Sequence, residues 1–594
     1  MANNTPPTLI SRRRLLLSCL ALFVLAFAVR TLTWQDNRLD AWKVQTSVTH
    51  RYKESARQLV NGQFKTFLTD VPRLGHPPGY PIVLATVYLT VGESDTALQF
   101  LQITVDSASV VLLFLISLEL FSLSVSLLAG VLAALSPQFA YFSVLLLPDS
   151  LVVLPILLAL YLIVKSRQRF NWWRLLIAGV FIGVSCWLRA NALFLPVFVG
   201  VAAALTTSKG KRVSAAVAVL AGAVIAIAPI TIKNAIVFHA FIPLSLGSGQ
   251  TLLEGLADYD PKGTLNIPNT DLGLTRQEAD WYGRPDYADG LFNVDGIERD
   301  RMRVRRGLTT IAQHPFWFAG VMGKRALAST RLDPVPPLRA QSPLSHPVDV
   351  TTLKPIWSEE KTAVWPTASI VWVTHNQSAT RGFYSGYAQL RIEGANQPQT
   401  KTIPVSSFHD FVFEVPIQVL EGRIELKVIS GGKVLGSTIV ETDDQSGYQQ
   451  GINVELPFVS GNNSELQLAI ANSASAQSKL TFDRVRLFDV GPSSLTWLRF
   501  VRAPLRFMQT VFKTAWTIPV LILGIGILIQ RKQLPSLILL FAVPAYYLIV
   551  QSALHTERRY VYVIHFFFLV IVSVALCWVT SLIIHFVARR ASTS

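Results

Sequence analysis

Apolar runs separated by short polar turns fill the beginning and the end of the chain. A bilayer core about 30 Å thick is crossed by a helix of roughly 20 mostly apolar residues. Candidate runs lie at residues 15–29, 98–120, 125–147, 151–164, 175–188, 194–205, 215–232, 518–529, 534–549 and 561–587. The pattern predicts an α-helical polytopic membrane protein with about ten spans.

Basic residues between these runs predict the orientation of the helices. The first run follows three arginines and lacks a small-residue cleavage site at its end, so we expect an uncleaved span; a signal peptide is the alternative. With the N-terminus inside, the positive-inside rule requires basic cytoplasmic turns. The basic segments on that side are 165–174, 209–212, 531–532 and 589–590. If the run 80–91 also crossed the membrane, these basic segments would lie on the outer side. The orientation therefore requires that this run does not cross. We expect a multi-pass protein of the cell (inner) membrane with both termini cytoplasmic.

Two long segments are therefore predicted outside the cytoplasm, the loop 31–79 and the stretch from 233 to about 514. In the second, helical and Pro-rich patterns give way to short β-branched runs between Gly, Asn, Ser and Asp turns. These runs lie at 368–374, 388–393, 411–415, 423–429, 453–458, 465–471 and 481–488. Seven or so strands at this spacing are typical of an antiparallel β-sandwich. The predicted domains are an N-terminal bundle (1–232), a mixed helical and loop region (233–354), a jelly-roll-like sandwich inserted before the last three spans (355–492) and C-terminal helices (493–594).

Composition supports the membrane assignment and excludes other classes. Charged residues make up 15% of the 594 residues, against about 25% in soluble proteins. The net charge of +16 comes without a basic face or a motif that would bind nucleic acid. All three cysteines lie inside apolar runs, so neither a disulfide framework nor a zinc site is predicted.

Charged residues also fall at the predicted outer ends of the spans. Asp149 follows Pro148 at the start of a run, where it either caps a helix or meets a substrate at the mouth of the bundle. Cations on this side are not needed for orientation, and arginine binds phosphate in a bidentate manner; snorkelling to the headgroups is the alternative. The candidate binding residues here are Arg189, Lys233, Asn234, His555, Glu557, Arg558 and Arg559.

The first outer loop adds further candidates. Tyr52 lies on the apolar face of a helical pattern at 51–59, which also fits an amphipathic helix on lipid. His76 opens a rigid Pro-rich turn, and Asp40 and Glu54 are acids of the same loop. Carboxylates and cations at one face of a bundle suit a substrate with a lipid tail and a phosphate head. Asp106 lies within a span, where a charge is costly unless it is paired or faces the interior.

Several motifs follow one another along the chain. They are Tyr52-x3-Ala56-x2-Leu59-x2-Gly62, Pro77-Pro78-Gly79-Tyr80-Pro81, Trp187-Leu188-Arg189-Ala190-Asn191, the run from Pro229 to Asn234 with the glycines after it, His314-Pro315 with Lys324, and Glu557-Arg558-Arg559-Tyr560. Taken in order, they resemble the GT-C glycosyltransferases, most closely the protein mannosyltransferase-like family (glycosyltransferase family 39) and its aminoarabinose-transferase relatives. The resemblance covers about residues 10–330 and 510–590.

This resemblance implies a GT-C-like fold and the transfer of a sugar from a polyprenyl-phosphate-linked donor at the outer face. In the family a loop aspartate is the general base and basic residues hold the departing phosphate. Asp149 matches the acid of the second outer loop. The loop aspartate normally precedes the tyrosine matching Tyr52 by three or four residues, but Thr49 and Val48 stand there. Asp40 or Glu54 substitutes for it, Asp149 acts alone, or the usual activity is lost.

The predicted function is thus a glycosyltransferase with Asp149, Asp40 and Glu54 as candidate catalytic residues. Its expected partners are a polyprenyl-phosphate sugar donor, a protein or glycan/lipid acceptor and the bilayer, not nucleic acid. No cofactor or metal site is expected, and a divalent cation stays an open question. The alternatives are a transporter or flippase of lipid-linked sugar, although the repeated halves typical of transporters are not evident, and a catalytically inactive carbohydrate-binding relative.

Overall fold

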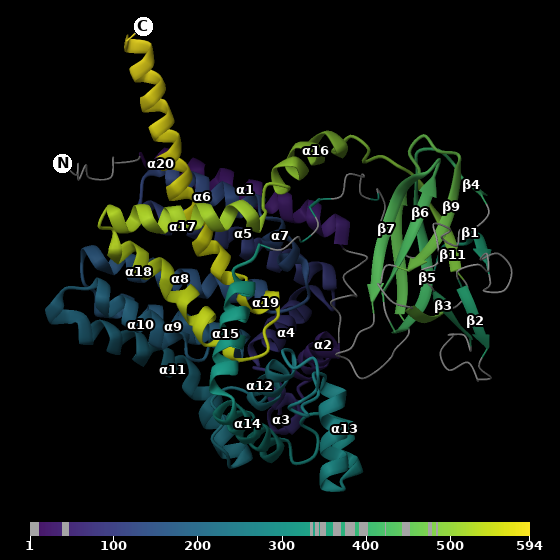
Figure 1. Ribbon diagram of the computed structural model, residues 1–594, viewed down its shortest axis with the longest axis horizontal. Coiled ribbons are helices and arrows are strands. Elements are labelled where there is room, and N and C mark those ends of the chain that lie inside the picture. The colour runs from purple at the N-terminus through teal and green to yellow at the C-terminus, as the bar shows by residue number, and fades with distance from the viewer. Residues whose placement is uncertain are drawn as a thin grey trace. The chain divides into compact units, whose positions relative to one another are not determined.

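The computed structural model describes residues 11–37, 47–332, 335, 337–338, 344, 352–359, 370–374, 386–390, 402–421, 423–441, 452–472, 478–482 and 485–593. The chain divides into two compact units. One comprises residues 1–34, 47–337 and 508–594, and the other comprises residues 35–46 and 338–507. The first is helical, and strands dominate the second (Figure 1).

Apolar helices long enough to cross a membrane account for much of the described chain. Six qualify without a sharp bend: α1 (Arg12–Asn37), α5 (Asp95–Leu120), α8 (Asp149–Gln168), α11 (Arg212–Phe238), α18 (Leu534–Ile549, continued by a helical turn to Ala553) and α20 (Val563–Thr593). Two bent pairs raise this number to eight: α6 (Leu123–Leu135) with α7 (Pro137–Val144), and α16 (Leu498–Gln509) with α17 (Thr514–Gln530). Shorter apolar helices are α4 (Gly79–Val91), α9 (Trp172–Leu188) and α10 (Leu195–Thr206). A helical multi-pass protein is confirmed, whereas the count of about ten spans and the orientation stay predictions.

A fully buried ion pair joins two of the long helices. Arg30 of α1 donates through Nε to Oδ2 of Asp106 in α5 at 2.5 Å, and neither side chain is exposed. The Arg30 Nη1 group also donates to the carbonyl oxygens of Ala26 and Ala134, each at 3.2 Å. A charge inside an apolar bundle is tolerated only with such partners. The intramembrane Asp106 is therefore paired, and its role is to hold α1 against α5.

The polar part of the helical unit consists of shorter helices. They are α2 (Ser47–Val60), α3 (Phe64–Thr69), α12 (Ser248–Ala257), α13 (Asp271–Tyr282), α14 (Gly296–Gln313) and α15 (Pro315–Ser329). Glu278 of α13 accepts hydrogen bonds from Arg299 and Arg303 of α14 at 2.6–2.9 Å in a buried cluster. Apolar side chains from these helices and the segments between them form one core.

The second unit contains two antiparallel sheets. Its strands are β1 (Pro355–Glu359), β2 (Ile370–Thr374), β3 (Gly386–Leu390), β4 (Ile403–Pro404), β5 (His409–Glu421), β6 (Arg423–Ser430), β7 (Lys433–Glu441), β8 (Ile452–Val459), β9 (Glu465–Asn472), β10 (Ser478–Phe482) and β11 (Val485–Pro492). One sheet runs β1-β11-β5-β10-β3-β2 with β8 also paired to β5, and the other runs β4-β9-β6-β7. Inward side chains of both, including Phe413 and Leu426, share one apolar core, as in a β-sandwich.

Most predicted strands coincide with observed ones, but four details differ. The sequence pattern did not predict β1, β4 or β7. The predicted run 481–488 divides into β10 and β11. β4 has only two residues, and β7 contains Gly436 and begins after the turn glycines 431 and 432. Short length and interior glycine both weaken the period-two signal.

Removing one partner of the buried Arg30–Asp106 pair is expected to destabilise the protein strongly. Asp106→Ala leaves a buried guanidinium without its carboxylate, which costs about 3–5 kcal/mol in comparable pairs. The matched control is Glu93→Ala, which breaks the half-exposed Arg57–Glu93 pair and should cost less than about 1 kcal/mol. Thermal unfolding of both variants in one detergent makes the comparison. Equal losses of stability would contradict the assignment.

Candidate functional site

The strongest candidate site is built around an ion pair between the ends of two helices. Asp149 is the first residue of α8, directly after Pro148, and Arg189 follows the last residue of α9. Arg189 donates to Oδ1 of Asp149 from Nε at 2.9 Å and from Nη2 at 2.5 Å, and to Oδ2 from Nη2 at 2.6 Å. The Asp149 side chain is 4% exposed and that of Arg189 is 18% exposed. Both oxygens of the carboxylate are therefore engaged, while the Arg189 side chain keeps some exposure.

A second charged pair comes from the segment before α20. Glu557 precedes the short helix α19 (Arg558–Val561) and accepts hydrogen bonds from Arg559 Nη2 at 2.6 Å and from the Tyr560 hydroxyl at 2.9 Å. The Tyr560 ring lies beneath Arg189, 4.6 Å from its guanidinium carbon, and beneath Arg559 at 5.3 Å. Burial raises the pKa of Glu557, but Arg559 and these hydrogen bonds outweigh it and leave the pKa below its usual value. Tyr560 therefore joins two arginines that the sequence placed far apart.

Aromatic side chains of the first outer loop lie beside these charges. The Tyr52 ring of α2 is 5.1 Å from the His76 ring and 5.0 Å from the Tyr80 ring. Burial, with the nearby guanidinium groups of Arg51 and Arg189 among others, lowers the pKa of His76 to about 3. Its imidazole is therefore neutral at physiological pH. Burial likewise raises the pKa of Tyr52, on which Arg189 and Asp149 also act electrostatically. Loop and helix ends thus form one cluster.

The Pro-rich turn is fixed to the end of α9 by a very close backbone approach. A Cβ atom placed on Gly79 would lie 2.4 Å from the carbonyl oxygen of Trp187. Only glycine fits this distance without moving backbone. The turn that carries His76 and Tyr80 is therefore held against Trp187, two residues before Arg189.

Two buried polar atoms in the cluster have no hydrogen-bond partner among the described residues. They are Nε of Arg559 and the hydroxyl oxygen of Ser150, the residue after Asp149. Native proteins leave few buried polar atoms unsatisfied, and each calls for an explanation. An anion bound beside Arg559 would satisfy its Nε.

The remaining predicted residues are distributed differently. Glu54 is 63% exposed and lies 3.5 Å from Arg73, on the face of α2 away from Tyr52. Lys233 lies over the Phe238 ring of its own helix, and Asn234 donates to the carbonyls of Ile242 and Leu244, so Asn234 shapes the chain after α11.

Three others fall elsewhere or outside the description. His555 contacts Asp258 Oδ2 through Nδ1 at 2.8 Å. Arg558 is exposed. Asp40 lies outside the described residues, and Thr49, at one of the two positions where the family has its loop aspartate, is buried. The structure therefore brings together Asp149, Arg189, Glu557, Arg559, Tyr52 and His76.

Sequence reasoning missed the roles of Tyr560 and Tyr80. Both stand inside motifs that it quoted, but aromatic residues next to apolar runs are ordinary core residues. Only the stacking of Arg189 on the Tyr560 ring distinguishes Tyr560 from an ordinary core residue.

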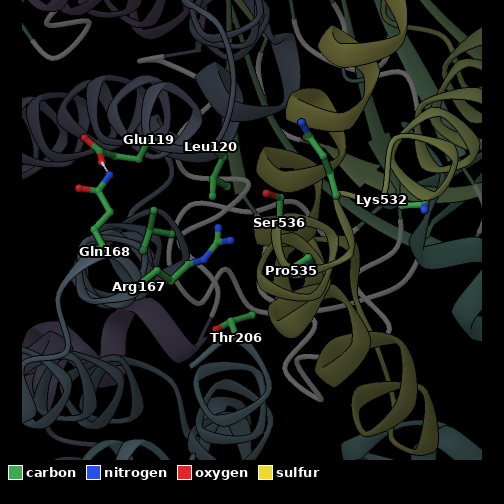
Figure 2. A pocket seen from close by; sticks show the side chains of 10 residues that line it. Glu119, Leu120, Arg167, Gln168, Thr206, Lys532, Pro535 and Ser536 are labelled. Carbon is green, nitrogen blue, oxygen red and sulfur yellow. Dashed lines mark hydrogen bonds between the residues drawn. The ribbon is translucent and has the colours of Figure 1, made fainter. Parts of the chain in front are cut away.

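A separate cavity of about 480 Å³ lies at the other end of α8 (Figure 2). Arg167 and Gln168 of its wall are nineteen and twenty positions into the helix that Asp149 begins, so the cavity is roughly 27 Å from Asp149 at 1.5 Å per residue. Thr206, Lys532 and Ser536 also line it. This end is cytoplasmic in the predicted orientation, so the cavity is distinct from the charged cluster.

No group of three or more His, Cys, Asp or Glu side chains that could hold a metal ion occurs in the described part of the chain. The expectation that no cofactor is needed stays a prediction.

Comparison with known proteins supports part of the resemblance. Residues 75–232 match the family described as dolichyl-phosphate-mannose-protein mannosyltransferase. This range contains Asp149, Arg189, His76 and Tyr80. The match confirms the predicted resemblance for this part of the chain and supports a membrane glycosyltransferase. A search of curated proteins finds no match.

Two solved structures are distantly similar. The Saccharomyces cerevisiae protein O-mannosyltransferase Pmt1-Pmt2 complex bound to the sugar donor has 11% identity and a TM-score of 0.34, covering 96% of this chain and 85% of that one. The arabinosyltransferase EmbB from Mycobacterium smegmatis has 11% identity and a TM-score of 0.25, covering 79% and 65%. With TM-scores this low, neither likeness bears on the site.

The low pKa of His76 predicts a pH-dependent stability. Because its folded pKa of about 3 lies below the unfolded value of about 6.5, the unfolded chain binds the proton first as the pH falls below that value. His76 therefore costs stability increasingly between pH 6.5 and 3 and costs none above. We expect His76→Gln to lose less melting temperature than the wild type between pH 7.5 and pH 5. A parallel loss in both proteins, measured by thermal unfolding in one detergent, would show that His76 is not buried in its neutral form.

Proposed function

We propose that the chain transfers a sugar from a polyprenyl-phosphate-linked donor to a hydroxyl acceptor at the outer face of the membrane. The acceptor is a protein or a glycan/lipid. One observation carries the proposal: a buried carboxylate and two arginines meet at one end of the bundle, beside the Pro-rich turn. The family match over this region supports the same class of reaction.

The arginines suit a leaving phosphate. Arg189 and Arg559 share the Tyr560 ring, and Arg559 keeps an unsatisfied Nε. Guanidinium groups form charge-assisted hydrogen bonds to phosphate oxygens. Positioned before the reaction, they stabilise the negative charge that develops when the bond between the sugar and the phosphate breaks.

Asp149 is the proposed general base, and its pairing suggests how it is controlled. With both oxygens held by Arg189, the carboxylate is poorly placed to accept a proton. A donor phosphate competes for Arg189 and frees one carboxylate oxygen. That oxygen then takes the proton of the acceptor hydroxyl as the hydroxyl oxygen attacks the anomeric carbon. The electron pair of the broken bond leaves with the lipid phosphate.

The inactive carbohydrate-binding relative is the second candidate. It is favoured by the buried Thr49 at a position where the family has an aspartate and by the outward exposure of Glu54. Such a protein would keep the phosphate-binding arginines and would bind the lipid-linked sugar without turning it over.

Purified protein in nanodiscs is assayed with a panel of polyprenyl-phosphate sugars, and both binding of the sugar donor and release of lipid phosphate are measured. For the transferase, Asp149→Asn should lower kcat by about 10²–10⁴-fold, the usual contribution of general base catalysis, and leave donor affinity largely unchanged. Arg189→Gln should weaken donor binding as well as turnover. The control is Asp286→Asn, which breaks the exposed Arg284–Asp286 pair and should leave both unchanged.

Each outcome separates the candidates. Donor binding without release of lipid phosphate, with any donor or acceptor, would select the inactive relative. Movement of the lipid-linked sugar across liposomes without transfer would select the transporter. Full turnover by Asp149→Asn would remove Asp149 as the base while leaving the transferase function in place.

A further inference from the structure

Helix α16 carries a continuous exposed apolar stripe that the function proposed above does not use. Trp497, Phe500, Phe507 and Met508 are 56%, 85%, 73% and 43% exposed. Val501 and Pro504 continue the same line, which recurs every three or four residues as one helical face does. Exposing so many large apolar groups to water is unfavourable.

The opposite face of α16 is buried and anchored. Arg502 is fully buried and donates to Oδ1 of Asp36 at 2.6 Å, near the end of α1. Gln509, about two helical turns after Arg502, donates through Nε2 to the carbonyl oxygen of Leu135. The distance is 3.3 Å, and Leu135 is the last residue of α6. These contacts determine which face of α16 is buried. The apolar stripe therefore lies on an exposed face of the helix.

α16 is continuous in the chain with an apolar helix. α17 begins five residues after α16 ends, at a bend of 59°, and the two together are long and apolar enough to cross a membrane. In the predicted orientation α17 begins at the outer surface, which is where α16 joins it. We therefore expect α16 where the apolar core meets the headgroups.

Charge completes the pattern. Arg499 and Arg506 are exposed and lie between the apolar stripe and the buried face of α16, and α16 contains no acidic residue. An amphipathic helix with aromatic and apolar residues on one face and arginines beside it is typical of segments that lie in the plane of a membrane surface. Anionic headgroups complement the arginines.

We infer that α16 is an interfacial anchor whose apolar stripe is inserted into the outer leaflet and whose arginines bind anionic lipid headgroups. Trp497 and the two phenylalanines reach the boundary of the acyl chains. This inference depends on the membrane assignment and not on the proposed reaction.

The test uses the full chain in nanodiscs containing phosphatidylglycerol, with its three cysteines replaced by alanine. Single cysteines at Phe500 and at Phe507 carry a nitroxide label, and accessibility to oxygen and to a water-soluble nickel complex is measured. Ile522 of α17 is the control for the apolar core, and Asn462, exposed in the turn between β8 and β9, is the control for water. Both stripe positions should show an oxygen-to-nickel ratio several-fold above that of Asn462 and at or below that of Ile522.

Two results would overturn the inference. Stripe labels as accessible to nickel as Asn462 would place the helix in water, and labels shielded from both reagents would show that protein covers it.

The arginines are tested by Arg499→Gln/Arg506→Gln with the label at Phe507. The oxygen-to-nickel ratio should rise with phosphatidylglycerol content in the parent and not in this variant. An identical rise in both would remove the headgroup contact. Agreement between the two label positions guards against a local folding defect at either one.

Discussion

The ion pair between Asp149 and Arg189 is the constraint around which the candidate site is arranged. It joins the first residue of one apolar helix to the residue that ends the next. Without a carboxylate, an arginine so little exposed would be costly at the edge of a bilayer. Stacking on Tyr560 adds a third segment, from the far end of the chain, to the same group. The Arg189 guanidinium therefore joins all three segments and holds the site together.

A second, deeper ion pair shows what a purely structural charge looks like in this bundle. Arg30 and Asp106 have no exposure at all, and their contacts lead only to backbone carbonyls and to each other. Arg189 differs because its side chain is partly exposed. Burial depth, rather than the presence of a charge in a helix, separates the two roles.

Much of the helical fold could be predicted because a bilayer imposes a simple rule on composition. Apolar runs of sufficient length identified α1, α5, α8, α11 and α20. The same rule overlooks α16, whose apolar residues lie on one face only and are diluted by arginines. Strands with glycine or of two residues were missed for a similar reason.

The candidate site was only partly predictable. Asp149, Arg189, Glu557 and Arg559 were singled out because charged residues at span ends are unusual. The contacts that join them could not be foreseen, since Asp149 and Arg189 are 40 positions apart and Tyr560, which connects Arg189 to the Glu557–Arg559 pair, comes from the far end of the chain. Lys233 and Asn234 carried the same sequence signal, but Asn234 binds local carbonyls and Lys233 a local ring. A charged residue at a helix end can therefore belong to a site or make a local structural contact. The sequence does not distinguish these two cases, but the contacts in the structure do.

The close approach of Gly79 to Trp187 has a consequence for how the site could diverge. Any side chain at position 79 would collide with the carbonyl oxygen of Trp187. Substitution at this position therefore cannot change the shape of this edge of the cluster. Room for a different sugar or acceptor has to come from side chains instead, such as those of α2, which presents Tyr52, and of the segment leading to His76. A variant library aimed at altered selectivity would therefore spare the glycine and sample residues 47–74.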